Sequence, residues 1–196
     1  MGKIICLMGK SSTGKDTIYK HLLADHELGL KKIVPYTTRP IRRGERDGVE
    51  YYFKSEQDFQ QMKDRDRIIE AREYHTVHGL WRYFVADDGQ IERSGNYIMI
   101  GTLEAYRHLQ GYFGADRVLP VMIELDDGAR LQRALNRERK QENPKYEEMC
   151  RRFLADSEDF SEEKIAEAGV TARFVNNNLE QCLEHIRRYI TIQTGC

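Results

Sequence analysis

The feature that most constrains this chain is a short polar loop near its start, bracketed by glycines. The apolar run Ile4–Met8 before the loop predicts a buried strand, and the apolar residues of 18–23 after it have the spacing of a helix that packs one face inward. The loop consists of Gly9, Lys10, Ser11, Ser12, Thr13, Gly14, Lys15, Asp16 and Thr17. The positions of its two glycines and of Lys15 are those of a phosphate-binding loop, whose amides, helix N-terminus and lysine ammonium hold a polyphosphate. A plain glycine-rich turn is the alternative.

One position of this loop departs from the usual pattern. Asp16 follows Lys15, where a Ser or Thr normally binds Mg²⁺, and Thr17 comes next. A loop that ends Gly-Lys-x-Thr resembles those of nucleoside monophosphate kinases. We therefore assign the hydroxyl that binds Mg²⁺ to Thr17. Asp16 then acts on the metal through water, or it favours the first turn of the helix.

Composition narrows the class of protein. The chain has 196 residues, with 31 Lys+Arg against 32 Asp+Glu, which suits one compact domain with inserted flaps. A formal net charge of −1 argues against binding to nucleic acid or to a membrane surface. The cysteines at 6, 150, 182 and 196 show no close pairing or metal spacing, which predicts reduced thiols and a cytoplasmic protein. No apolar run approaches bilayer length, and we expect no signal peptide.

The middle of the chain predicts a small, mostly β insert. Segment 31–36 indicates a short strand, and the Pro- and Gly-punctuated loop 37–45 follows it. Further strands are expected at 50–53, 67–74 and 80–85, with a helix that begins near Ser55.

From residue 96 onward strands and helices alternate. Strands are expected at 97–100, 117–125 and 172–175, and helices at 102–112, 127–139, 146–160, 161–168 and 179–192. Together with a strand over 2–8 and a helix over 15–27, this alternation predicts a three-layer α/β fold with a parallel sheet covered on both faces. The phosphate loop then lies at the carboxyl ends of the strands.

Taken together, these stretches resemble guanylate kinase, through nearly the whole chain. The most specific segment is Thr37-Thr38-Arg39-Pro40-x-Arg42-x-Gly44-Glu45, followed by Asp47-Gly48-x-x-Tyr51-x-Phe53. It is similar to the family's GMP-binding segment, which implies that Arg39, Arg42 and Tyr51 hold the phosphate of GMP. Guanidinium groups suit this role because they match phosphate oxygens in paired hydrogen bonds. A solvated loop face and a core tyrosine are the alternatives.

The resemblance also implies a base-reading site. Glu70 follows Ile68-Ile69 as the guanine-reading glutamate follows an apolar pair in the family. Tyr83 is the candidate for the second phosphate-binding tyrosine, although its spacing from Glu70 is longer than usual and Phe84 stands where a glycine is expected. An aromatic core residue is the alternative for Tyr83.

Arginines in the second half of the chain resemble those of the family's lid over ATP. Arg133, Arg137 and Arg139 correspond to the lid arginines, and Arg152 to an arginine that reaches the reacting phosphates and so also the acceptor. Fixed cations of this kind stabilise the transferring phosphoryl group. A charged helical face is the alternative, since glutamates are interleaved. Asn176 resembles a late asparagine at the ATP site, and capping of the last helix accounts for it equally well.

Three positions depart from the family pattern. Pro35 stands where a serine helps to read the base, and Met99 and Gly101 stand where the family has an acidic pair. These losses bear on which acceptor is used.

The resemblance implies transfer of a phosphoryl group from ATP to GMP with Mg²⁺, with Lys15, Arg39, Arg137 and Arg152 as catalytic residues. It divides the chain into a core (1–36, 96–136 and 147–196), a GMP-binding insert (37–95) and a lid (137–146). ATP and GMP are the expected partners. A same-fold kinase for another phosphorylated acceptor, such as a phosphosugar, and a non-catalytic interaction module are the alternatives. Oligomeric state is not readable from the sequence.

Overall fold

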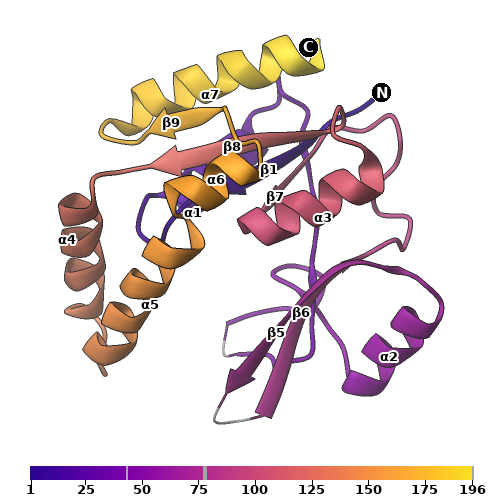
Figure 1. The fold of residues 1–196 in the computed structure, drawn as a ribbon, viewed down its shortest axis with the longest axis horizontal. Helices are drawn as coiled ribbons and strands as arrows, with labels where there is room; N and C mark the ends of the chain where they lie inside the picture. Colours follow the sequence, from indigo (N-terminus) through magenta and orange to yellow (C-terminus); the bar gives the residue numbers. More distant parts are fainter. Residues whose placement is uncertain (43, 77–78, 196) are drawn as a thin grey trace.

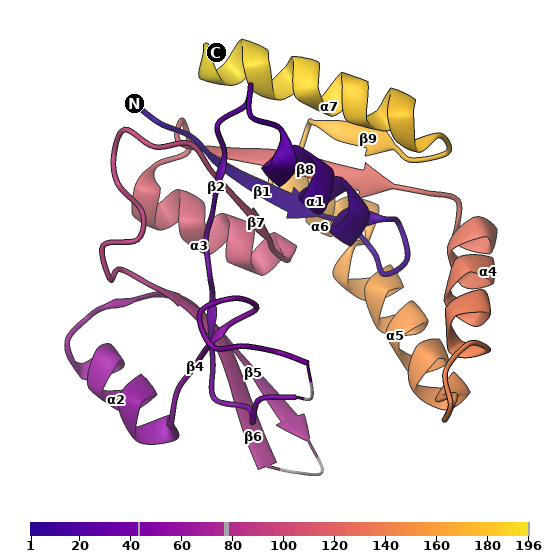
Figure 2. The same cartoon turned by 180° about the vertical axis from the view of Figure 1, so that it is seen from behind.

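A five-stranded parallel sheet forms the centre of the larger part of the molecule. The structure is a computed structural model, and it describes residues 1–42, 44–76 and 79–195. The strands, in spatial order, are β2 (Lys31–Lys32), β7 (Tyr97–Ile100), β1 (Ile4–Met8), β8 (Val118–Glu124) and β9 (Arg173–Val175) (Figures 1 and 2). β1 lies between β7 and β8 and is fully buried, as expected for an apolar run covered on both faces.

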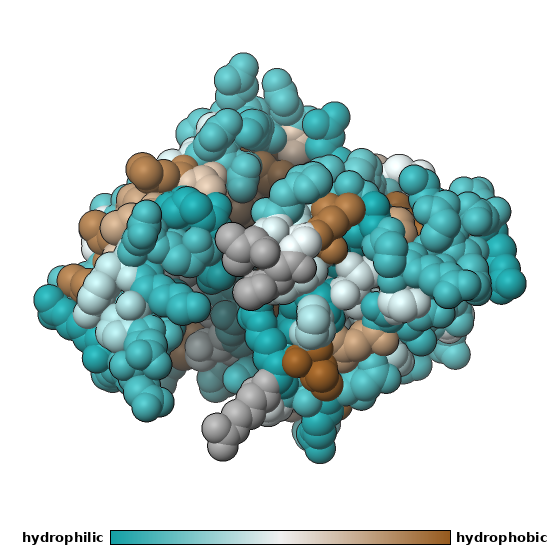
Figure 3. Space-filling view, turned by 90° about the horizontal axis from the view of Figure 1, so that it is seen from below, coloured by the Kyte–Doolittle hydropathy of each residue, from teal (hydrophilic) through white to brown (hydrophobic). Residues whose placement is uncertain are grey.

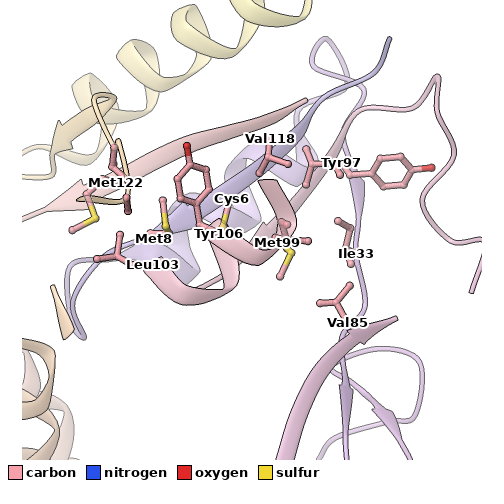
Figure 4. Close-up of a cluster of buried hydrophobic side chains, with 14 of the residues drawn as sticks. Cys6, Met8, Ile33, Val85, Tyr97, Met99, Leu103, Tyr106, Val118 and Met122 are labelled. Atoms are coloured by element: carbon pink, nitrogen blue, oxygen red, sulfur yellow. The ribbon is translucent and has the colours of Figure 1, made fainter. Parts of the chain in front are cut away.

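Helices cover both faces of this sheet (Figures 1 and 2). α1 (Lys15–Ala24) and α7 (Leu179–Thr194) cover one face, and α3 (Leu103–Phe113) and α6 (Glu162–Glu167) cover the other. α4 (Asp127–Glu138) and α5 (Tyr146–Asp159) extend away from the sheet, beyond the carboxyl end of β8. Alternate residues of β1 divide between the two faces: Ile5 and Leu7 pack with α1 and α7, whereas Cys6 and Met8 pack with α3 and α6. Figure 4 shows part of the second cluster, around Cys6, Met99 and Tyr106.

Side-chain caps explain where several helices begin. Thr102, Asp126 and Asn178 each accept a hydrogen bond from the backbone N–H three residues later, at the starts of α3, α4 and α7. The helix predicted at 127–139 begins at Asp127, directly after its cap Asp126. Among the helices that the structure describes, none is both long and apolar enough to span a membrane.

A second, mixed sheet forms the smaller part of the molecule. Its spatial order is β4 (Tyr52–Phe53), β3 (Tyr36–Thr37), β6 (Gly79–Ala86) and β5 (Ile68–Thr76). α2 (Glu56–Asp64) starts at a capping box between Ser55 and Asp58, and its Phe59 packs with Phe84 in a small core. Seen from below, the surface is mostly hydrophilic and is hollowed between the helical part at the left and the second sheet at the right (Figure 3).

The single strand expected at 31–36 is wrong. It divides into β2, in the first sheet, and β3, in the second. Two features interrupt the strand: the Val34 N–H donates to the side chain of Gln90, a distant residue, at 2.9 Å, and Pro35 has no N–H to continue the ladder. The boundary expected at 36/37 therefore falls inside β3.

Candidate active site

The loop between β1 and α1 needs glycine at both ends. Gly9 and Gly14 have φ angles of 142° and 96°, in the region that side chains disfavour. A Cβ on Gly9 would lie 2.3 Å from the carbonyl oxygen of Ile123, and one on Gly14 would lie 2.4 Å from Nδ2 of Asn176. The backbone of the loop therefore packs directly against β8 and against the residue that follows β9.

Lys15 is the first residue of α1, and its side chain reaches back to this loop. Its Nζ donates to the carbonyl of Lys10 at 2.8 Å, and Thr13 Oγ1 donates to the same carbonyl at 2.9 Å. Burial lowers the pKa of Lys15, with Arg130 and Arg137 acting in the same direction and Asp16 and Asp156 opposing them. A desolvated ammonium beside backbone amides is well suited to bind an anion.

Two of the residues predicted for the ATP site lie against the loop. Asn176 Nδ2 donates to the Thr13 carbonyl at 2.7 Å, in a buried position, and Arg133 Nη2 donates to the Asn176 carbonyl at 3.3 Å. Asn176 therefore braces the loop, whereas the cap of α7 is Asn178. The hydroxyl of Thr17 and the carboxylate of Asp16 are exposed on the first turn of α1.

The other predicted lid arginines lie at the end of α4 and on α5, and among them Arg137 acts on the pKa of Lys15. Arg137 is in the last turn of α4, and Arg139 is the residue that ends that helix. Arg152, on α5, is 60% exposed and pairs with Glu148 at 2.8 Å on its own helix. The structure therefore brings Arg133 and Asn176 to the loop but leaves Arg152 turned toward an intrahelical partner.

Sequence reasoning missed two residues that contact the loop. Arg130 on α4 is completely buried and donates from Nε to the Ser11 carbonyl at 3.1 Å. Asp156 on α5 accepts a hydrogen bond from the Ser11 N–H at 2.6 Å. Arg130 precedes Arg133 by three residues on one helix face, a spacing that could have been noted, but its burial could not be seen in the sequence.

A second cluster gathers around Arg39 in the second sheet. Arg39 is 3% exposed, and Glu45 accepts from its Nη1 and Nη2 at 2.7 and 2.5 Å. Its guanidinium lies 5.1 Å from the ring centroid of Tyr51 and 5.3 Å from that of Phe53. Hydrogen bonds from Arg39 lower the pKa of Glu45 to about 2. Arg39 Nε has no hydrogen-bond partner in the part of the chain that the structure describes.

Tyr83 joins this cluster. Its ring lies 5.5 Å from that of Tyr51, edge to face, and its hydroxyl interacts with Arg39. Phe84 points to the opposite face of β6, into the core, because side chains alternate along a strand. Arg42 contributes its backbone N–H, which donates to Glu45 at 2.8 Å, while its side chain is exposed. The structure therefore brings Arg39, Tyr51 and Tyr83 together.

Glu70 is more enclosed than the sequence suggested. It is 2% exposed, and both of its oxygens accept from Arg72, from Nε and Nη2, each at 3.2 Å. Burial raises the pKa of Glu70, and Arg72 and His108 oppose this rise while Glu104 of α3 adds to it. Arg72 was not predicted as a site residue. In this conformation Arg72 contacts both oxygens and the Glu70 side chain is fully buried, so a base could reach the carboxylate only after a rearrangement.

The departures at the end of β7 have a packing reason. A Cβ on Gly101 would lie 2.7 Å from the Sγ of Cys6, which is itself completely buried. Met99 is 2% exposed and packs in the core beside Cys6 (Figure 4). Cys6 therefore fills the space that a side chain at position 101 would need.

Comparisons with known proteins agree with this arrangement. The family model described as guanylate kinase matches residues 1–94. The chain is 30% identical to a guanylate kinase of Porphyromonas gingivalis over an alignment 197 positions long, which covers 97% of each protein. It is 41% identical to a guanylate kinase of Caldanaerobacter subterraneus over 85 residues, 43% of this chain and 41% of that protein.

A solved structure shares the fold. The crystal structure of guanylate kinase from Anaplasma phagocytophilum superimposes with a TM-score of 0.66 at 20% identity, covering 98% of this chain and 86% of the other. The expected α/β fold with a parallel sheet is confirmed. Because the P. gingivalis relative is similar over almost its full length, this chain belongs to the guanylate kinase family.

Proposed function

We propose that this protein transfers the γ-phosphoryl group of ATP to GMP, giving ADP and GDP. The observation that carries the proposal is that one molecule contains two separate clusters of side chains that suit a phosphate group. One is the loop with the partly buried Lys15, and the other is the cluster of Arg39, Tyr51 and Tyr83. A kinase for a phosphorylated acceptor needs both, one for each substrate.

We assign the donor site to the phosphate loop and its neighbours. The residues are those of 9–17 with Arg133, Arg137 and Asn176, and Lys15 neutralises charge on the ATP phosphates. Thr17 and Asp16 offer exposed oxygens, the donor type that Mg²⁺ takes. The described residues hold no cluster of three or more metal-ligating side chains, which suits an ion that arrives with ATP and keeps its waters. When bound, Mg²⁺ would offset charge on the phosphates.

We assign the acceptor phosphate to Arg39, Arg42, Tyr51 and Tyr83, and the guanine to Glu70. An oxygen of the acceptor phosphate forms the new bond to the γ-phosphorus, and the bond to the bridging oxygen breaks, leaving ADP. The acceptor oxygen is already ionised, so no general base is required. The protein contributes position and fixed positive charge, to which Arg137 and Arg152 add when the lid closes.

The three-part organisation belongs to the same proposal. The first sheet with its helices corresponds to the core, the second sheet to the insert 37–95, and the connection between α4 and α5 to the lid at 137–146. A cytoplasmic location is also part of it, because ATP and reduced thiols occur together there.

The test is ADP formation by purified protein with ATP, Mg²⁺ and each of GMP, AMP, CMP and UMP, or no acceptor. We expect GMP to be the best acceptor. Lys15→Ala should remove transfer and weaken ATP binding while its circular dichroism and melting stay near wild type. Equal rates with AMP, full activity in Lys15→Ala, or transfer to a phosphosugar but not to GMP would refute the proposal.

A further inference from the structure

Side chains from both α4 and α5 hold the backbone of Ser11 in the phosphate loop. The Ser11 N–H donates to Oδ2 of Asp156 at 2.6 Å, and the Ser11 carbonyl accepts from Nε of Arg130 at 3.1 Å. Arg130 also pairs with Asp156 at 3.4 Å and with Asp127 at 2.7 Å. Together these contacts hold the first turn of α4 and the last turn of α5 against Ser11.

The burial of this cluster makes it specific. Arg130 is 0% exposed, and its guanidinium lies 4.7 Å from the ring centroid of Phe153. The side chain of Asp156 is 16% exposed. Charged groups this enclosed remain only when they are paired and hydrogen-bonded, so Asp156 has a defined position on the loop.

A carboxylate in this position places a negative charge on a loop built to bind anions. Asp156 is close enough to Lys15 for its charge to raise the pKa of that amine, against the larger effect of burial. The loop amides and Lys15 are the groups that hold polyphosphate. A terminal phosphate at this end of the loop and the Asp156 carboxylate would therefore repel each other.

We propose that Asp156 is a positioning residue that occupies this end of the phosphate loop until ATP displaces it, which moves α5. This inference rests on the ATP site proposed above. Arg152 precedes Asp156 by four residues and lies on the same face of α5. Displacement of Asp156 shifts the helix that carries Arg152, which otherwise pairs with Glu148. Binding of ATP to the loop is therefore coupled, through the Asp156 carboxylate, to the position of Arg152.

The experiment compares ATP and ADP affinities by calorimetry in wild type, Asp156→Asn and Asp159→Asn. The asparagine keeps an acceptor oxygen for the Ser11 N–H but removes the charge. Asp159→Asn removes the same charge from an exposed position on the same helix and is the matched control. We expect Asp156→Asn to bind ATP about tenfold more tightly, because one repulsion between like charges at a partly solvated site is removed. The gain for ADP should be smaller.

The direction of the change separates this role from a structural one. A folded Asp156→Asn variant that binds ATP equally or more weakly would overturn the inference. Hydrogen exchange of residues 146–159 in wild type is the second measurement, independent of any variant. Exchange in the second half of α5 should change when ATP is added, and unchanged exchange at saturation would overturn the inference. Wild type that binds no ATP would instead refute the proposed function.

Discussion

The Glu70–Arg72 pair allows a structural role and a base-reading role to be separated. The variants are Glu70→Gln, Arg72→Met and the double variant, with Glu73→Gln as the control. Glu73 lies on β5, like Glu70, and pairs with Arg82 of β6 at 2.7 Å, but its side chain is 49% exposed, whereas that of Glu70 is 0% exposed.

The burial of the pair sets the expected magnitude. Removing one partner of a buried ion pair leaves a charge without compensation and costs about 3–5 kcal/mol. For a chain of this size each kcal/mol lowers the Tm by about 2–4 °C, so each single variant should melt roughly 6–20 °C lower. The double variant leaves no unpaired charge and should recover most of this loss. Glu73→Gln should cost less than about 1 kcal/mol, because the side chain of Glu73 is 49% exposed and Arg82 still pairs with Glu56.

The pH dependence has a definite sign. Burial raises the pKa of Glu70, and in Arg72→Met the compensating cation is gone, so the pKa rises further. The folded state then holds a proton that the unfolded state releases near pH 4.5. Arg72→Met should therefore lose stability as pH rises from about 4.5 through the raised pKa, and Glu70→Gln should not.

The assay pairs urea unfolding with initial rates for GMP and AMP. If Glu70 reads guanine, the double variant recovers stability but still loses its preference for GMP, because no carboxylate accepts from N1–H and the N2 amino group. A double variant that recovers both would show that the pair is only structural. Single variants that unfold within about 1 kcal/mol of wild type would refute the reasoning from burial.

Three further predictions concern the remaining charged residues. Arg39→Ala and Arg42→Ala should each raise the KM for GMP by an amount equivalent to roughly 1.5–3 kcal/mol while ATP affinity stays unchanged; separate titrations check this, and an equal loss of ATP affinity would contradict it. Arg137→Ala and Arg152→Ala should lower kcat more than they change KM, because these arginines contact the transferring phosphoryl group only when the lid closes. Steady-state kinetics check this, and a change in KM alone would assign both arginines to substrate binding in the ground state. The pKa of Glu45 is lowered to about 2 by Arg39, so its contribution to stability is present above about pH 4.5 and is lost as pH falls toward 2. The stability difference between wild type and Glu45→Gln should therefore shrink across that range in unfolding at stepped pH, and a constant difference would argue against the pairing.

The elements of the fold could be predicted because their signals are local. The apolar run of β1, the glycine spacing that follows it and the capping box at Ser55 are each complete within a few residues. The prediction of one strand at 31–36 was wrong because the break between β2 and β3 depends on Gln90, a partner far along the chain. Arg39 and Tyr51 could be predicted as neighbours because they belong to one continuous motif.

Local sequence was enough to locate the glycine-bracketed loop of residues 9–17, the alternation of strands and helices and the arginine-rich segment. Only the tertiary structure decided which charged groups are buried and what they contact. Arg130 looks like one more arginine on a charged helix, yet it reaches Ser11, 119 residues away, and Asp156 reaches the same residue across 145. Gly101 lacks room for a side chain because of Cys6 on a neighbouring strand. The physical reason is the same in each case: desolvation and steric exclusion depend on every atom packed around a group, and distant segments supply those atoms.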